Sequence, residues 1–118
     1  MGGFFGVVSQ NDCIIDLFYG TDYHSHLGTK RGGLAVMRSD DNLVRAIHNI
    51  ENAQFRSKFD GEIDKMHSKI GIGVISDYED QPILIRSHLG DYGIVTVGVI
   101  TNMEELSKDA FGKRGMHF

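Results

Sequence analysis

Two short apolar runs separated by a polar turn place the strongest constraint on the fold of this chain. Residues 34–38 and 43–48 have the composition of strands, and the sequence Ser-Asp-Asp-Asn lies between them. This arrangement predicts a β-hairpin, in which the two strands run antiparallel. The remaining segments must then supply strands and helices that bury the faces of the resulting sheet.

Four further segments have the short, apolar composition of strands. Residues 3–9 form the first, and the run Ile-Gly-Ile-Gly-Val-Ile-Ser at residues 70–76 forms the second. Pro82 precedes the third, at residues 83–88, and the sequence Leu-Gly-Asp-Tyr-Gly returns the chain into the fourth, at residues 94–100. The glycines of the second segment favour the close approach of another backbone.

Three helical segments separate or follow these strands. The first begins after Asn11, which can cap a helix, and ends near Gly20. In residues 51–69 apolar side chains recur at steps of four, four and three, which predicts a helical stripe broken near Gly61. A final helix opens at Asn102 with a pattern like a capping box and ends near Phe111. Antiparallel strands with helices on the outer faces define an α+β fold, in a single domain spanning residues 1–118.

Composition excludes several functional classes. A net charge of −4 without a lysine or arginine cluster argues against a nucleic-acid-binding protein. No apolar run approaches the roughly 20 residues needed to cross a bilayer, and the N-terminus lacks the pattern of a secretory signal. The single cysteine, Cys13, excludes an intrachain disulfide and fits a reducing compartment. We therefore expect a cytoplasmic protein that binds neither nucleic acid nor membranes.

Three motifs are candidates for chemistry, and each has a structural alternative. The glycine-rich segment 28–33 could hold an anion on its backbone N–H groups, but a turn that enters a strand explains it better. His24 and His26 could bind a metal, although the nearby sequence offers few other ligands. Cys13 could be a nucleophile at a helix N-terminus, although its apolar neighbours favour packing. We expect neither a bound metal nor a cofactor.

Taken in order along the chain, a set of short motifs resembles the class II glutamine amidotransferases, the amidophosphoribosyltransferase branch in particular. That family opens with Cys-Gly-Ile-x-Gly, has a helix ending Leu-Tyr-Gly, and continues with His-Arg-Gly-x-x-Ser-x-Gly. Later it has a strand Ile-Gly-x-Gly-His-x-Arg-Tyr-Ser-Thr before Gln-Pro, and His-Asn-Gly-Asn-Leu-Thr-Asn before an acidic helix start. The similar segments here are residues 2–6, 17–20, 26–33, 70–76 with Gln81 and Pro82, and 96–102 followed by Glu104 and Glu105.

The resemblance implies an N-terminal-nucleophile-type αββα sandwich of antiparallel sheets, of which this chain is an incomplete, N-terminal fragment. It also implies a partner, a phosphoribosyltransferase domain in the rest of the parent chain that forms phosphoribosylamine in purine biosynthesis. A sandwich cut short exposes strand edges and an apolar sheet face. We therefore expect the chain to form a homo-oligomer.

The same resemblance implies that the glutaminase site is degenerate. The family's nucleophile is an N-terminal cysteine, and Gly2 stands in that position without a side chain that could attack an amide. The family's glutamine-binding arginine falls near Ser76, and its oxyanion-stabilising asparagine aligns with Val97. Gly98, whose backbone N–H is the second oxyanion donor, is retained. The pocket formed by Ser76, Val97 and Gly98 is therefore expected to be inactive toward glutamine.

Three hypotheses about function follow from these observations. The first is a pseudoenzyme, a glutaminase-like domain with a structural or regulatory role beside a phosphoribosyltransferase domain. The second is an active amidotransferase with another nucleophile, for which Cys13 is the available thiol. The third is a small phosphate- or metal-binding module that uses the loop of residues 23–33.

Overall fold

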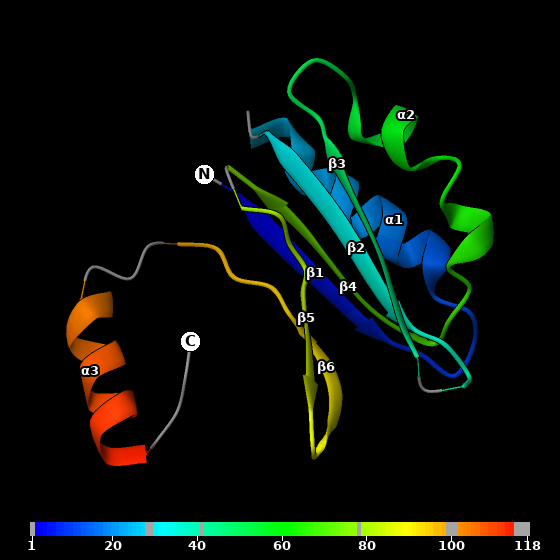
Figure 1. Cartoon of the computed structure of the whole chain (residues 1–118). Helices are drawn as coiled ribbons and strands as arrows, with labels where there is room; N and C mark the ends of the chain where they lie inside the picture. The colour runs from blue at the N-terminus through cyan, green and yellow to red at the C-terminus, as the bar shows by residue number, and fades with distance from the viewer. Residues whose placement is uncertain (1, 28–29, 41, 78, 99–101, 115–118) are drawn as a thin grey trace.

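The computed structural model describes residues 2–27, 30–40, 42–77, 79–98 and 102–114. Its helices and strands are labelled in Figure 1. In order they are β1 (Gly3–Val8), α1 (Ile14–Asp22), the 3-10 helix η1 (Tyr23–Leu27), β2 (Arg31–Met37), β3 (Leu43–Asn49), α2 (Phe55–Phe59), the 3-10 helix η2 (Ile63–Lys65), β4 (Ile70–Ser76), β5 (Ile83–Ser87), β6 (Gly90–Ile94) and α3 (Met103–Arg114).

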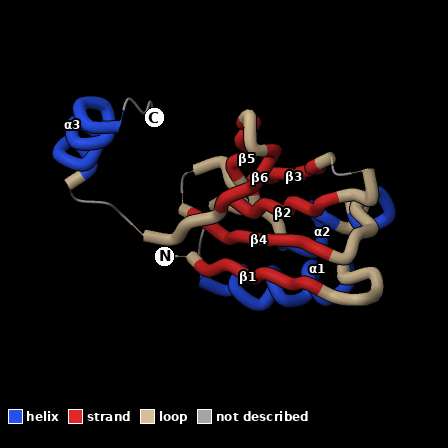
Figure 2. Tube along the Cα trace, turned by 90° about the horizontal axis from the view of Figure 1, so that it is seen from below, coloured by secondary structure: helices blue, strands red, loops and turns tan. Residues whose placement is uncertain are grey.

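The strands form two antiparallel sheets. Four strands make the larger sheet in the order β1-β4-β2-β3, and β5 pairs with β6 in a separate hairpin. Figure 2 shows α1 and α2 on one face of the larger sheet and the β5–β6 hairpin on the other. The predicted α+β class, the antiparallel pairing and the hairpin of β2 and β3 are thus confirmed.

The hydrophobic core lies between the larger sheet and the helices. Along β1 exposure alternates, so that Phe5 and Val7 pack against the core while Phe4 and Val8 lie on the opposite face. The aromatic rings of Phe55 and Phe59 stack with centroids 4.4 Å apart. The buried members of the core are Ile14, Leu17, Phe18, Leu34, Val36, Ile50, Phe55, Phe59, Met66 and Ile75.

Glycines let α1 approach β4 closely. A β-carbon on Gly73 would overlap the hydroxyl of Thr21, and one on Gly71 would lie 2.6 Å from a methyl carbon of Leu17. The glycines of β4 predicted the close approach of another backbone, whereas their nearest neighbours are side chains of α1. Gly20 has a related role, because a β-carbon there would lie 2.6 Å from the ring of Phe5. Helix α1 continues past Gly20 to Asp22.

The predicted helical stripe at residues 51–69 is broken near Gly61, as expected, into the two short pieces α2 and η2. Phe55, Phe59 and Met66 are all buried, as their spacing indicated. Both pieces are short, since α2 contains 5 residues and η2 only 3.

The strand predicted at residues 94–100 is wrong, because β6 spans Gly90–Ile94. Ser87 pairs directly with Gly90, so a tight turn at His88 and Leu89 closes the hairpin and the strand pairing ends at Ile94. Residues 95–98 lie outside any strand, and residues 99 and 100 lie outside the described residues.

The sheet face opposite the helices is only partly covered by the hairpin. Phe4 and Val8 are 59% and 79% exposed, and Ile70 is also exposed. Across the part of the chain that the structure describes, no helix has the length and apolar character to cross a membrane.

Candidate functional site

One end of the larger sheet brings together several of the residues singled out in the sequence. Gly2 directly precedes β1, Ser76 ends β4, and Arg31 begins β2. In the strand register Gly3 lies opposite Ile75, and Arg31 lies opposite Ser76. A β-carbon on Gly2 would lie 3.4 Å from the α-carbon of Ser76. The expected nucleophile and glutamine-binding positions are therefore neighbours in space.

The backbone at Gly2 leaves no room for a side chain in its present position. A β-carbon built there would overlap the carbonyl oxygen of Ile75 and lie 3.0 Å from the carbonyl carbon. Because these are backbone atoms, a side chain at position 2 can be accommodated only if the end of a strand moves. The position lacks a nucleophile, and it is also sterically closed to one.

Ser76 is tied into the fold by its hydroxyl group. The side chain is buried, and its Oγ donates a hydrogen bond to the carbonyl oxygen of Glu79 at 2.7 Å. A neutral hydroxyl engaged in this way cannot form the paired, charge-assisted hydrogen bonds with which an arginine holds a carboxylate.

Arg31 is the cation that the register places beside Ser76, and the sequence analysis considered it only as part of an anion-binding loop. Its Nε lies 3.4 Å from Oδ1 of Asp80, so its charge is already paired at the surface. Only the register of β2 against β4 could have identified Arg31 as a neighbour of Ser76.

Gln81 connects the segment carrying Val97 and Gly98 to the same sheet. Its buried side chain accepts a hydrogen bond from the backbone N–H of Thr96 at 2.7 Å and contacts the Thr96 hydroxyl at 3.4 Å. Its backbone carbonyl lies directly against Gly33 in β2. The sequence analysis identified Gln81 only as part of a family motif and did not predict this role.

Val97 and Gly98 lie in an open environment. Val97 is 40% exposed, and Gly98 adopts a positive φ of 134° with free space where a β-carbon would stand. The structure thus places Gly2 and Ser76 together, and it attaches the segment of Val97 and Gly98 through Thr96 and Gln81.

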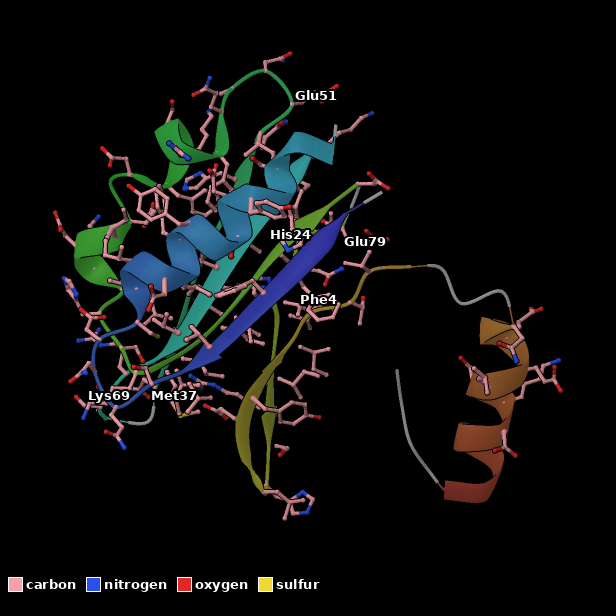
Figure 3. The ribbon with its side chains drawn as sticks, turned by 180° about the vertical axis from the view of Figure 1, so that it is seen from behind. Phe4, His24, Met37, Glu51, Lys69 and Glu79 are labelled. Carbon is pink, nitrogen blue, oxygen red and sulfur yellow. The ribbon has the colours of Figure 1, made fainter. Side chains whose placement is uncertain are left out.

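His24 lies at this end of the sheet, against the first residue of β1. A β-carbon on Gly3 would overlap Nδ1 of the imidazole, and the ring packs edge-on against Tyr23 with centroids 5.6 Å apart. Figure 3 shows His24, Phe4 and Glu79 near this end, with Met37 and Lys69 at the other. The side chain of His26 lies outside the described residues, and the described part of the chain contains no cluster of three metal-binding side chains.

The glycine-rich segment does not form an anion-binding loop where it is described. Gly32 and Gly33 are buried residues of β2, paired with β3 and β4. Lys30 donates its backbone N–H to Ser76 at 3.2 Å and accepts a hydrogen bond from Ile50 at 2.9 Å. These backbone groups are used within the sheet, which agrees with the alternative of a turn that enters a strand. Residues 28 and 29 lie outside the described residues.

Cys13 is buried at the start of α1, next to the other end of β1. Its side chain is fully buried, and its backbone N–H donates to Ser68 at 2.7 Å. Burial raises the pKa of the Cys13 thiol, and the neighbouring Asp12 carboxylate raises it further. A buried, protonated thiol is a poor nucleophile, so the geometry favours the packing role.

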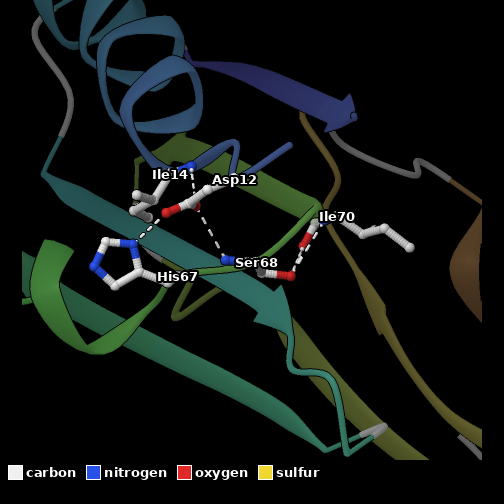
Figure 4. Close-up of polar contacts among 5 residues, drawn as sticks. All are labelled: Asp12, Ile14, His67, Ser68 and Ile70. Carbon is white, nitrogen blue, oxygen red and sulfur yellow. Dashed lines mark hydrogen bonds and ion pairs between the residues drawn. The ribbon is translucent and has the colours of Figure 1, made fainter. Parts of the chain in front are cut away.

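A hydrogen-bond network surrounds Asp12 beside Cys13 (Figure 4). Its carboxylate accepts hydrogen bonds from the backbone of Ile14 at 3.1 Å and Ser68 at 3.2 Å, and it pairs with His67. Burial acts to raise the pKa of Asp12, but these hydrogen bonds together lower it. The network fastens the start of α1 to the start of β4, and we assign it a structural role.

Two solved structures resemble this whole chain. One is described as the allosteric regulatory enzyme of purine biosynthesis, with 23% sequence identity and a TM-score of 0.77. The other is the glutamine phosphoribosylpyrophosphate amidotransferase from B. subtilis complexed with ADP and GMP, with 22% identity and a TM-score of 0.77. Each match covers 100% of this chain but 26% of the other, so this chain spans about a quarter of their length. No protein-family model and no curated protein sequence matches it. The likeness establishes a shared fold.

Proposed function

We propose that this chain is a glutaminase-like domain of an amidophosphoribosyltransferase-type protein that does not hydrolyse glutamine. The observation that carries the proposal is the pairing of a fold similar over the whole chain with a glycine at position 2, packed against Ile75. In this reading the domain belongs to an N-terminal-nucleophile-type αββα sandwich. Its site residues Gly2, Ser76, Val97 and Gly98 form a degenerate pocket.

The chemistry of these positions supports the loss of activity. Amide hydrolysis through a covalent intermediate needs a nucleophilic side chain, and Gly2 has none. Ser76 has no positive charge with which to bind a substrate carboxylate, and its hydroxyl already donates to the backbone carbonyl of Glu79. Removing a single oxyanion donor typically lowers the rate about 100- to 1000-fold, and Val97 offers no side-chain donor.

The proposed role is structural or regulatory, within a cytoplasmic protein of purine biosynthesis. The sheet face that carries Phe4 and Val8 is apolar and exposed, which supports contact with further protein. We propose that the rest of a parent chain, including a phosphoribosyltransferase domain, covers this face, and that the assembly is a homo-oligomer.

The test measures nitrogen transfer by the full-length parent protein. We expect no glutamate from glutamine, whereas ammonium chloride supports phosphoribosylamine formation. The B. subtilis amidotransferase named above provides the positive control. Glutamate release that is abolished by Cys13→Ala would overturn the proposal and make Cys13 the nucleophile. Release that persists in this variant would equally contradict it and would point to an unassigned nucleophile.

A further inference from the structure

A pocket of about 430 Å³ lies where the C-terminal end of α1 meets the start of α2. Both helices lie on the same face of the larger sheet (Figure 1). Asp22, Ser25 and Arg56 supply its polar groups, and Ile50, Ala53 and Phe55 supply apolar surface. None of these residues belongs to the degenerate pocket discussed above.

Asp22 is a buried carboxylate with too few hydrogen-bond donors. Its side chain is only 8% exposed, and its Oδ2 accepts a hydrogen bond from Nε of Arg56 at 2.8 Å. Within the described residues, Oδ1 has a contact with the Ser25 hydroxyl at 3.4 Å, but that hydroxyl donates its single proton to the Asp22 carbonyl at 2.6 Å. An ionised carboxylate can accept about four hydrogen bonds, so Oδ1 retains unused capacity.

The position of Asp22 is unfavourable for the isolated fold. It is the last residue of α1, where the helix dipole disfavours a negative charge, and burial removes most of its hydration. A buried charge that breaks local rules in this way is often part of a functional site. Arg56 offsets part of these costs at Oδ2, and an additional cationic donor at Oδ1 would offset them further.

Arg56 provides the opposite charge at the same pocket. Its side chain is 61% exposed and lies over the ring of Tyr19, 5.3 Å from the centroid. Only its Nε is used in the contact with Asp22, and within the described residues its two terminal amino groups make no hydrogen bond. These groups are suited to a carboxylate, which a guanidinium binds in a paired geometry.

We propose that this pocket binds an α-amino acid with a small apolar side chain. The ammonium group donates to Oδ1 of Asp22, and the carboxylate accepts from the terminal amino groups of Arg56. The side chain packs against Ile50 and Phe55, which are buried and apolar. The site is independent of the proposed glutaminase ancestry, because it uses different residues at a different place in the fold.

The first experiment titrates the ¹⁵N-labelled 118-residue chain with three matched probes and follows backbone amide shifts. L-Valine carries both charges, isobutylamine only the ammonium group, and isovalerate (3-methylbutanoate) only the carboxylate. We expect saturable shifts at Ser25, Gln54 and Arg56 with L-valine, and at least about tenfold weaker binding of the other two. Equal binding of isobutylamine and L-valine would overturn the role of Arg56. Absence of saturable shifts with L-valine up to roughly tens of millimolar would overturn the site itself.

The second experiment uses variants with matched controls. Asp22→Asn and Arg56→Gln should each weaken L-valine binding about tenfold or more, whereas Asp60→Asn and Lys58→Gln, which change exposed charges of the α2 region, should leave it unchanged. Because removing one partner of a buried pair can unfold a protein, Ala53→Leu provides a test that keeps the ion pair and fills the pocket. Full binding by a folded Ala53→Leu variant would refute the proposed location.

Discussion

The α-carbon of Gly2 faces the carbonyl oxygen of Ile75 so closely that a β-carbon on Gly2 would overlap that oxygen. This contact joins the start of β1 to the end of β4. We predict that Gly2→Cys does not restore glutamine hydrolysis, because the cysteine can enter only if a strand end moves. The measurement is glutamate release by the variant parent protein. Release at a rate approaching that of an enzyme with a native N-terminal cysteine would show that the strand end yields.

Gly33 packs against the backbone of Gln81 in the same manner. A β-carbon on Gly33 would overlap the Gln81 carbonyl oxygen and lie 2.8 Å from a ring carbon of Pro82. We expect Gly33→Ala to lower the free energy of unfolding by about 1–3 kcal/mol, as overpacking does. The matched control is Gly6→Ala, where the nearest atom would be 3.8 Å away and alanine should be neutral or stabilising by about 0.5 kcal/mol. Equal stability of the two variants in urea denaturation would contradict this account.

Thr21 has a buried hydroxyl that finds no hydrogen-bond partner among the described residues. Because an unsatisfied buried polar group carries a desolvation penalty, Thr21→Val should raise the free energy of unfolding by about 1 kcal/mol. Thr21→Ser keeps the hydroxyl and loses a buried methyl group, so it should lower stability. Thermal denaturation of the three proteins decides the sign, and a destabilised valine variant would indicate that the hydroxyl has an important partner.

Asp12 links stability to acid pH. Burial opposes ionisation, but the hydrogen bonds from Ile14, His67 and Ser68 prevail and hold the pKa of Asp12 below its ordinary value. A carboxylate whose pKa is lower in the folded state stabilises the protein above the unfolded pKa of about 3.9, and this contribution is lost as pH falls through the folded value. We expect the stability difference between the native chain and Asp12→Asn to shrink as pH falls below about 4. Because Asp12 is largely exposed to solvent, the difference should not exceed about 1 kcal/mol.

The Asp12 prediction is checked by urea denaturation at a series of pH values. A stability difference that grows as pH falls below about 4 would mean that Asp12 has a raised pKa in the folded state.

The exposed sheet face should drive self-association of the 118-residue chain. Phe4 and Val8 lie on the side of β1 away from the helices. We expect light scattering to give a mass above that of a monomer, and we expect Phe4→Lys with Val8→Lys to reduce it. The matched control is Ile15→Lys, which introduces the same charge at an exposed position of α1. A monomeric native chain would contradict the prediction that the face carrying Phe4 and Val8 drives self-association.

The strand at Ile70–Ser76 was predicted with its observed bounds, because a short apolar run between polar segments is a local signal. The hairpin of β2 and β3 and the stripe of Phe55, Phe59 and Met66 were likewise encoded by local composition and periodicity. The order of motifs along the sequence predicted four residues of the candidate site, which are Gly2, Ser76, Val97 and Gly98. It also favoured a packing role for Cys13, which its burial supports.

The sequence by itself therefore determined the α+β class, the approximate places of the strands, and the lack of a nucleophilic side chain at position 2. Tertiary structure decided which residues meet. These contacts include Gly2 with Ile75, the hydrogen bond from Thr96 to Gln81, and the ion pair of Asp22 with Arg56. It also decided where α1 and β6 end, against the signals of Gly20 and residues 94–100. The physical reason is that composition and periodicity act over a few residues, whereas register and close approach depend on partners distant in the chain. Asp22 and Arg56 are 34 residues apart, so only the packed fold could bring them together at one pocket.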